Sequence, residues 1–434
     1  MKKNILVVGP ALSRSGYGEQ TRFALRALKS REDLFNIFII PTNWGGTGWV
    51  VESDEERKWI DERVMETQQR NQFGLSYDAT LQVDIPWAPP PPNQPNVEPA
   101  GWRQFTDHDI GFTAGVETNK VSPQWIEKAQ HVKKIIVVSE HSKNVYNDTV
   151  YVATDKSTGR QMSISNKTPI DAVGYPVREI EAEDLDLELR HDFNFLVMSQ
   201  WCRRKNMENT IKWFVEEFHD DEVGLVVKTN LVKNCLMDRT RTAKSISSII
   251  KNYPDRKCSV TLVHGNMSEN EIAGLYKHPK ITAFLSLAHG EGFGIPIFDA
   301  AINELPVVTP AWGGPLDFIV MPDKKGRNSI PVARVEFTMG QIQPDAVWDG
   351  VLQKDSMWCY PDEDSAKAKM RDVFRRYSKY KSKAVELSKF LKNKFTEENQ
   401  YAKFVDALDI DFSEVEEDFN VDSWLDNIDA MEFE

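Results

Sequence analysis

The chain carries at positions 286–300 the sequence Ser286-Leu-Ala-His-Gly-Glu-Gly-Phe-Gly-Ile-Pro-Ile-Phe-Asp-Ala300. An apolar run at 281–287 leads into it, and the apolar residues after the last glycine predict the start of a helix. A glycine-rich loop before a helix presents backbone N–H groups to an anion such as phosphate. Two carboxylates, Glu291 and Asp299, frame this loop, and the second, about two turns into the helix, can accept hydrogen bonds from sugar hydroxyls.

The segment resembles the E-x7-E signature of retaining GT-B glycosyltransferases, the glycogen-synthase and mannosyltransferase group often called family 4. In that family the first Glu contacts the donor sugar, the loop amides hold the sugar and the diphosphate, and the second Glu binds the ribose. The resemblance implies the first role for Glu291 and the ribose role for Asp299. It implies the loop role for Gly292, Phe293 and Gly294.

Two features depart from the family pattern. Asp299 replaces the usual Glu, which shortens the reach of the carboxylate by one methylene. Asn303-Glu304 stands where the family usually has a glycine before the strand that begins Leu305-Pro-Val-Val. The signature therefore predicts the chemistry of the site and leaves the donor open.

A basic segment, Arg203-Arg-Lys205-Asn206, follows the predicted strand at 193–198 and precedes a predicted helix. Open α/β sheets bind ligands at the carboxyl ends of their strands. Arg or Lys at such a place can stabilise the charge of a departing diphosphate, and the resembled family has an Arg/Lys pair here. We predict catalytic roles for Lys205 and Arg203 and a donor contact for Arg204; an exposed basic loop is the alternative.

Two more candidates end strands of the second half. Lys228 ends the predicted strand at 224–228 and is either a second phosphate contact or a surface lysine. His264 ends the predicted strand at 259–264. In the resembled family this region holds the nucleobase, and the alternative is a histidine of the core.

The first half offers two candidates. Gly16, within Ser15-Gly-Tyr-Gly18, resembles the glycine loop that approaches the donor in the family's N-terminal domain; the alternative is a tight turn. Glu117 follows the predicted strand at 110–116. It either orients an acceptor hydroxyl or has a structural role such as helix capping.

Strand and helix patterns alternate in two cycles, beginning at the apolar runs 4–8 and 193–198. Such alternation predicts parallel sheets. The expected fold class is α/β with two doubly wound, Rossmann-like domains, which the resemblance makes the GT-B fold with a cleft between the domains. We place an N-terminal, acceptor-side domain at 1–177 and a linker at 178–192. A nucleotide-sugar domain follows at 193–394. Residues 395–434 are expected to form a C-terminal helix and an acidic tail that pack back on the first domain. Within the nucleotide-sugar domain, residues 364–393 are predicted to be helical and basic.

Composition indicates a soluble globular protein: 41% of the 434 residues are hydrophobic and 27% are charged. No apolar run approaches the roughly 18 residues that a membrane helix needs, and the start is too short an apolar run for a signal peptide. Four scattered cysteines have no metal-ligand or disulfide spacing, which favours free thiols. We expect a cytoplasmic protein, in the host cytoplasm if a phage encodes it.

The net charge of −13 is concentrated at one end of the chain. No Lys or Arg follows Lys403, and residues 404–434 carry twelve acidic side chains, without which the net charge would be −1. Phe412, Phe419, Trp424 and Phe433 interleave with the acids. Two interpretations stay open: an interaction segment that binds a protein partner or docks on the body, and a solubilising tail without a partner.

We expect neither a metal nor a cofactor. Asp-x-Asp occurs at 184–186, 362–364 and 409–411, always within acidic runs, and none is predicted to be a metal site. The resemblance likewise implies a GT-B enzyme whose nucleotide sugar is a substrate and whose catalysis needs no bound metal.

The resemblance implies transfer of a sugar from a nucleotide sugar to a hydroxyl, with retention of configuration. The segments at 9–18, 111–117 and 201–206 look most like glycosyltransferases of tailed phages, some of which glycosylate hydroxymethylated pyrimidines in their own DNA. DNA is therefore a candidate acceptor, with basic segments at 239–244, 324–327 and 367–394 as its candidate surface. The alternatives are a cell-surface or lipid-linked glycan as acceptor, or a non-catalytic protein of this fold that binds nucleotide sugars or glycans.

Overall fold

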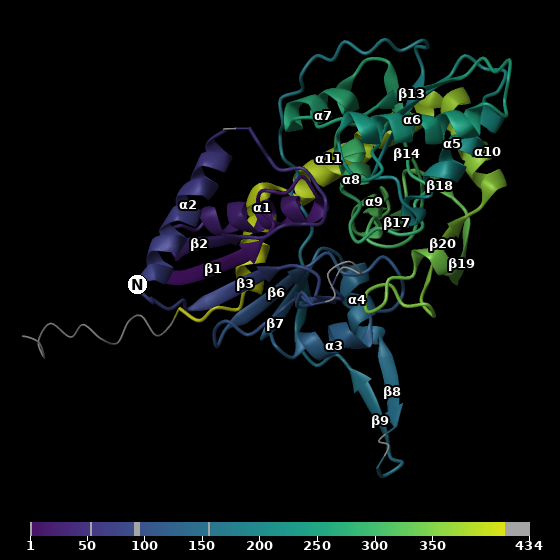
Figure 1. Ribbon diagram of the computed structural model, residues 1–434. Coiled ribbons are helices and arrows are strands. Elements are labelled where there is room, and N and C mark those ends of the chain that lie inside the picture. The colour runs from purple at the N-terminus through teal and green to yellow at the C-terminus, as the bar shows by residue number, and fades with distance from the viewer. Residues whose placement is uncertain (1, 53, 91–95, 155–156, 413–434) are drawn as a thin grey trace, which may run out of the picture.

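The computed structural model describes residues 2–52, 54–90, 96–154 and 157–412. They form two α/β domains, each built around a six-stranded parallel sheet (Figure 1), which confirms the predicted fold class. The first sheet has the strand order β10-β7-β6-β3-β1-β2. Its strands are β1 (Lys3–Gly9), β2 (Phe35–Pro41), β3 (Ala79–Val83), β6 (Asp109–Thr113), β7 (Lys134–Val137) and β10 (Ile170–Ala172).

Apolar side chains bury the first sheet on both faces. Ile5 and Val7 of β1 are completely buried, and β1 pairs in parallel with both β2 and β3. Parallel neighbours need crossover connections that cover the sheet. The helices of this domain are α1 (Gly16–Lys29), α2 (Glu55–Gln72), α3 (Pro123–Ala129) and α4 (Glu140–Asp148).

The second sheet has the order β13-β12-β11-β14-β15-β18. The chain runs outward from β11 to β13 on one side and from β14 to β18 on the other, so the switch point of the sheet lies between β11 and β14. The strands are β11 (Asn194–Met198), β12 (Gly224–Lys228), β13 (Ser259–Val263), β14 (Ile281–Leu285), β15 (Val307–Pro310) and β18 (Ala333–Val335). The helices between them include α5 (Met207–Glu217), α6 (Leu236–Ile250), α7 (Glu269–Lys277) and α8 (Ile295–Ile302).

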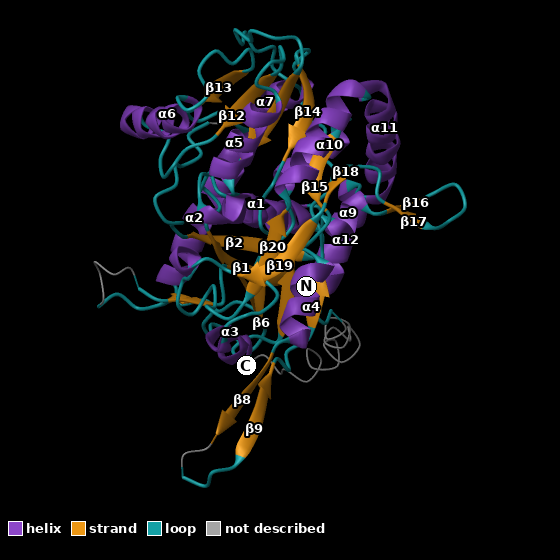
Figure 2. Cartoon of the chain, turned by 90° about the vertical axis from the view of Figure 1, so that its right-hand side faces the viewer, coloured by secondary structure: helices purple, strands orange, loops and turns teal. Residues whose placement is uncertain are grey.

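Short elements complete both domains. The two-stranded pairs are β4 (Trp87–Ala88) with β5 (Ala100–Gly101), β8 (Val150–Thr154) with β9 (Gln161–Ser165), β16 (Met321–Pro322) with β17 (Asn328–Ser329), and β19 (Phe337–Gln341) with β20 (Met357–Pro361). Figure 2 shows the pair β8–β9 projecting from the first domain. The short helices are η1 (Arg203–Lys205), α9 (Leu316–Ile319) and η2 (Pro344–Ala346).

The C-terminal helices return from the second domain to the first. They are α10 (Glu363–Arg375), α11 (Tyr377–Lys394) and α12 (Glu397–Ala407). Phe404 of α12 packs on Phe23 of α1, with ring centroids 5.2 Å apart, and Phe412 packs on Phe35, with centroids 5.6 Å apart. The acidic tail beyond residue 412, predicted to dock or to bind a partner, lies outside the described residues.

The structure differs from the sequence predictions at two places. β3 forms at 79–83, where no strand is predicted because Thr80 and Gln82 interrupt the apolar pattern. Gln82 is nevertheless buried, since its amide group bonds both the N–H and the carbonyl of Arg103. The stretch 364–393 is helical, as predicted, but a break at Arg376, whose φ of −118° is not helical, divides it into two helices.

Two further predictions concern the cysteines and membrane-spanning helices. Cys202, Cys235, Cys258 and Cys359 are all free. Among the described residues, no helix combines the length and the apolar character needed to cross a bilayer.

Candidate active site

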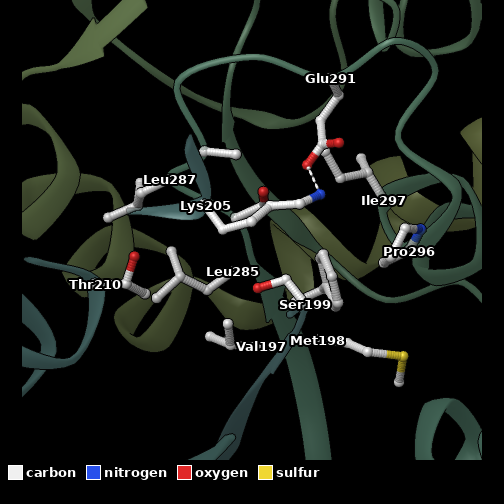
Figure 3. Close-up of a pocket in the computed structure, with 13 residues that line it drawn as sticks. Val197, Met198, Ser199, Lys205, Thr210, Leu285, Leu287, Glu291, Pro296 and Ile297 are labelled. Carbon is white, nitrogen blue, oxygen red and sulfur yellow. Dashed lines mark hydrogen bonds and ion pairs between the residues drawn. The ribbon is translucent and has the colours of Figure 1, made fainter. Parts of the chain in front are cut away.

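The predicted basic segment and the predicted signature loop meet at the switch point of the second sheet. η1 follows β11, and the loop of Glu291 follows β14, the neighbouring strand. Lys205 Nζ donates to Glu291 Oε1 at 2.5 Å, and both side chains are largely buried (Figure 3). The pair lines a small cavity of about 10 Å³, which is room for about one water molecule.

Arg204 joins the two domains at this point. Its Nη1 donates to Glu291 Oε2 at 3.0 Å and to the carbonyl of Gly290 at 2.8 Å. Its Nη2 lies 3.1 Å from Oε1 of Glu117, which follows β6 in the first domain. The predicted residues Glu117, Arg204, Lys205 and Glu291 therefore form one cluster of two cations and two carboxylates.

The charges of this cluster keep Glu291 ionised. Burial by itself would raise the pKa of its carboxyl group, but the positive charges of Lys205 and Arg204 and their hydrogen bonds outweigh burial and lower the pKa. Glu291 thus offers a carboxylate to whatever approaches from the domain boundary. The two cations beside it provide positive charge that an incoming anion can share.

Arg203 is not part of the cluster, although the sequence predicts a catalytic role for it. Its Nε donates to Asp345 Oδ2 of η2 at 2.5 Å, and its Nη1 lies 3.4 Å from Glu208. The side chain is 54% exposed. The turn of η1 points Arg203 away from the side on which Lys205 and Arg204 reach Glu291.

The glycines of the signature loop allow it to touch the first domain. A Cβ atom at Gly290 would lie 2.1 Å from the carbonyl oxygen of Glu117, and one at Gly292 would lie 2.5 Å from that of Ala114. Ser139, at the start of α4, donates its hydroxyl to the Gly292 carbonyl at 2.6 Å. These glycines therefore shape the domain boundary, in addition to the donor-binding role predicted for Gly292.

The other two loop residues have distinct environments. Phe293 is 3% exposed, and its ring lies 5.0 Å from the rings of both Tyr175 and Phe318, so its side chain belongs to the core. Only its backbone is placed to meet a ligand. Gly294 has φ +94°, a left-handed conformation that favours glycine, and immediately precedes α8.

Asp299, the predicted ribose ligand, is half-buried on α8. Burial raises the pKa of its carboxyl group to about 7, and the negative charge of Glu19 adds to the increase. Arg178 acts in the opposite direction, but it also lies 3.6 Å from Glu19 and 3.0 Å from Glu269. Asp299 is therefore a carboxyl group that titrates near pH 7, close to Glu19 of α1.

Lys228 and His264 lie at adjacent strand ends and have different partners. Lys228 Nζ donates to the carbonyl of Gly265 at 2.5 Å, and burial lowers the pKa of Lys228 to about 8. The His264 side chain is only 2% exposed and its Nε2 lies 2.9 Å from Asp238 Oδ1. This contact matches the alternative of a core histidine, because the pair ties the end of β13 to α6.

The glycine loop of the first domain surrounds the start of α1. A Cβ atom at Gly16 would meet nothing within 4 Å, so the backbone there is open to a ligand. At Gly18 a Cβ atom would lie 1.9 Å from the Ser13 carbonyl, so the tight turn depends on Gly18. The two readings of this loop, ligand approach and tight turn, thus belong to different glycines.

Residues that the sequence did not single out complete the boundary. Arg14 donates from Nη1 to the Met267 carbonyl in the second domain at 2.7 Å. His141, in the first turn of α4, packs edge-on against Trp312 with ring centroids 5.0 Å apart, and burial lowers the pKa of its imidazole to about 4. Its place just after β7, at the carboxyl edge of the sheet, is the signal that could have identified it.

Solved structures similar to this chain have the same two-domain arrangement. Sucrose-phosphate synthase from Thermosynechococcus elongatus has a TM-score of 0.57 at 13% identity, over 93% of this chain and 98% of that chain. A glycosyltransferase from Rickettsia africae has a TM-score of 0.56 at 13% identity, over 94% and 98%. HepE from Anabaena, solved in complex with UDP-glucose, has a TM-score of 0.55 at 9% identity, over 94% and 99%. The chain has the GT-B fold.

Sequence comparisons give no closer relation. No protein-family model matches the chain, and no curated protein matches it. At 9–13% identity the structural similarity establishes the GT-B fold and not the chemistry. The chemistry of this GT-B chain has to be argued from the cluster between its domains.

No group of three or more His, Cys, Asp or Glu side chains in the described parts of the GT-B chain is arranged to hold a metal ion. The candidate site is defined by the charged side chains of Glu117, Arg204, Lys205 and Glu291.

Proposed function

We propose that this GT-B protein is a retaining glycosyltransferase that moves a sugar from a nucleotide-sugar donor to a hydroxyl group. The observation that carries the proposal is the contact of Lys205 and Arg204 with Glu291 at the switch point of the second sheet. The two cations suit a diphosphate, and the carboxylate suits the hydroxyls of a sugar. The resemblance of 286–300 to the E-x7-E signature supports retention of configuration.

Donor binding would rearrange the cluster. The cavity beside Lys205 is too small for a sugar, so the donor approaches from the domain boundary, where Arg204 and Glu117 lie. The diphosphate then replaces Glu291 as the hydrogen-bond acceptor of Lys205 and Arg204, since phosphate oxygens are strong acceptors for both side chains. Glu291 is then free to accept hydrogen bonds from sugar hydroxyls, while Asp299 and the backbone around Gly294 face the nucleotide part of the donor.

The transfer step needs no nucleophile from the protein. The bond between the anomeric carbon and the diphosphate oxygen breaks, and the acceptor oxygen forms its bond to the same face of that carbon. The acceptor proton passes to the departing diphosphate. Lys205 and Arg204 stabilise the charge that develops on the leaving group, and Glu117 orients the acceptor hydroxyl across the boundary. Because these cations supply the positive charge, the reaction requires neither a metal nor a cofactor.

The acceptor candidates are hydroxymethylated pyrimidines in DNA and a cell-surface or lipid-linked glycan. The cations of α10 are less available to DNA than the sequence suggests: Lys367 bonds to two glutamates, and Arg371 pairs with Glu217 and Asp221. The basic segment at 239–244 stays exposed. The acceptor therefore has to be found by assay.

The test incubates the purified chain with a panel of nucleotide sugars and measures released nucleotide and acceptor mass. Acceptors are duplex DNA with and without hydroxymethylcytosine, and lipid-linked glycans. We expect donor-dependent nucleotide release that Glu291→Ala abolishes, and a gain of one sugar mass on one acceptor. Anomeric configuration of the product, measured by NMR, tests retention.

Other outcomes discriminate among the alternatives. Mass gain on hydroxymethylated DNA alone would identify a DNA glycosyltransferase, and gain on the glycan alone would move the acceptor there. Donor binding without release or transfer would indicate a non-catalytic binding protein. If calorimetry detects no binding of any nucleotide sugar, the proposed function is wrong.

A further inference from the structure

A cationic and apolar surface lies on the second domain where the loop after β12 enters α6. Three large apolar side chains are exposed there: Val232 is 58% exposed, Leu236 79% and Met237 69%. Four cations beside them are exposed as well, namely Lys233, Arg239, Arg241 and Lys244. We refer to these seven residues as the α6 patch.

The cations of the α6 patch are not paired with carboxylates of the described residues. None of the four forms an ion pair with any residue that the structure describes, in contrast to Lys367 and Arg371 of α10. Asp238 is the only acidic residue between 229 and 251. It is buried, where it accepts the backbone N–H groups of residues 231–233 and pairs with His264. The surface of the segment is therefore uniformly positive.

The patch lies beside the domain boundary. A Cβ atom at Gly46 of the first domain would lie 3.5 Å from the Lys233 side chain and 3.6 Å from that of Val232. Trp49, in the same loop of the first domain, is 48% exposed. In Figure 2, α6 projects from the upper left of the molecule, on the side where α2 of the first domain also lies.

We propose that the α6 patch binds the surface of an anionic lipid bilayer. Exposed aliphatic side chains gain free energy by entering the boundary between headgroups and acyl chains, and Lys and Arg around them attract anionic headgroups. DNA would use the cations but offers no apolar phase to Val232, Leu236 and Met237. The inference stands independently of the proposed function, because it concerns a surface outside the Lys205–Glu291 cluster.

The test is co-sedimentation of the full chain with vesicles of phosphatidylcholine alone or with about one-third phosphatidylglycerol. We expect at least about tenfold stronger partitioning onto the anionic vesicles, weakened by salt. The net charge of −13 opposes such binding by the chain as a whole, so the attraction has to be local. We expect Leu236→Ser with Met237→Ser, and separately Arg239→Glu with Arg241→Glu, to lower the partition coefficient at least about tenfold each.

A matched control uses another exposed apolar surface, which lies outside the α6 patch. Val152 and Met162 of the β8–β9 pair are 67% and 50% exposed, and Val152→Ser with Met162→Ser should leave partitioning unchanged. Circular dichroism and thermal melting confirm that each variant folds. Equal binding to both vesicle types, or α6 variants that bind like the wild type, would overturn the proposal.

DNA is the competing outcome and is measured with the same variants. A mobility shift of duplex DNA that Arg239→Glu with Arg241→Glu abolishes and Leu236→Ser with Met237→Ser does not, together with no vesicle binding, would make the patch a nucleic-acid surface. That result would also overturn the lipid proposal.

Discussion

Glu291 and Asp299 are eight positions apart on one loop and helix, yet their surroundings give the two carboxyl groups opposite properties. Glu291 has Lys205 and Arg204 within 3.0 Å, and its pKa is lowered. Asp299 meets burial and the negative charge of Glu19, and its pKa is raised to about 7. The end at Glu291 holds positive charge in place, whereas the end at Asp299 holds a carboxyl group that titrates near pH 7. Sequence spacing alone does not distinguish two such ends.

The largest effect is expected from removing Lys205, one of the two cations that lower the pKa of Glu291. Lys205→Ala should lower the initial rate of donor-dependent nucleotide release about 10²–10³-fold, because the leaving group loses its nearest positive charge. Arg203→Ala, two positions away and 54% exposed, is the matched control and should lower the rate less than about threefold. Equal losses in the two variants would show that η1 acts as a general basic surface.

Glu291→Gln tests the carboxylate itself. We expect the rate to fall about 100-fold, since the sugar loses a charged acceptor. Binding of the free nucleoside diphosphate should tighten up to about tenfold, because Lys205 and Arg204 no longer have to break an ion pair with Glu291. Isothermal titration calorimetry measures the dissociation constant of the diphosphate. If Asp299→Asn tightened diphosphate binding as much as Glu291→Gln, the two ends would not differ as the structure indicates.

The pH dependence of stability should have opposite signs at the two ends. The raised pKa of Asp299 means that the folded chain keeps a proton which the unfolded chain releases, so stability falls as pH rises from about 4 to about 7. Asp299→Asn removes this effect. Its Tm should equal that of the wild type near pH 4 and exceed it at pH 8 by about 2–4 °C, the shift for about 1 kcal/mol. Scanning calorimetry at both pH values is the measurement.

Glu291→Gln provides the reverse case for the same experiment. The lowered pKa of Glu291 contributes stability at neutral pH that is lost as pH falls. The variant should therefore have a lower Tm than the wild type at pH 8, and the difference should shrink toward acid pH. A Tm difference with the same sign and pH trend in both variants would contradict the assigned environments.

The smallest effect is expected from metal removal. Excess EDTA should leave the rate within about twofold of its value, because in the proposed mechanism Lys205 and Arg204 stabilise the leaving group. Loss of activity that Mg²⁺ or Mn²⁺ restores would show that a metal ion takes part, and the carboxyl end at Asp299 would then be the first place to look for it.

Much of the fold followed from pattern. Alternating apolar strands and helices predicted two parallel sheets, and the rule that ligands bind at strand carboxyl ends indicated Lys205, while the family resemblance indicated Glu291. β3 was missed because Gln82 becomes compatible with burial only through its bonds to Arg103, a partner 21 positions away. A partner that distant leaves no local signal.

The candidate site was predicted only in part, because contacts between distant segments leave no local signal. Consecutive basic residues in η1 look alike in sequence, but the turn of the short helix sends Arg204 to Glu291 and Glu117 and sends Arg203 to Asp345. Likewise, the role of the glycines in the signature loop was predicted from the family resemblance. Their contact with Ala114 and Glu117 appears only when the domains come together.

The sequence by itself determined the α/β class, the positions of the basic segment and the signature loop directly after predicted strands, and the concentration of acid after Lys403. These depend on periodicity and on which residues follow a strand, which are local properties. Only the tertiary structure decided which cations meet Glu291, that Arg204 links the domains and that the pKa of Asp299 is raised to about 7. It also decided that the cations of α6 form no ion pair with the described residues. Those outcomes depend on distance and burial between segments far apart in the chain, and local sequence does not encode them separately.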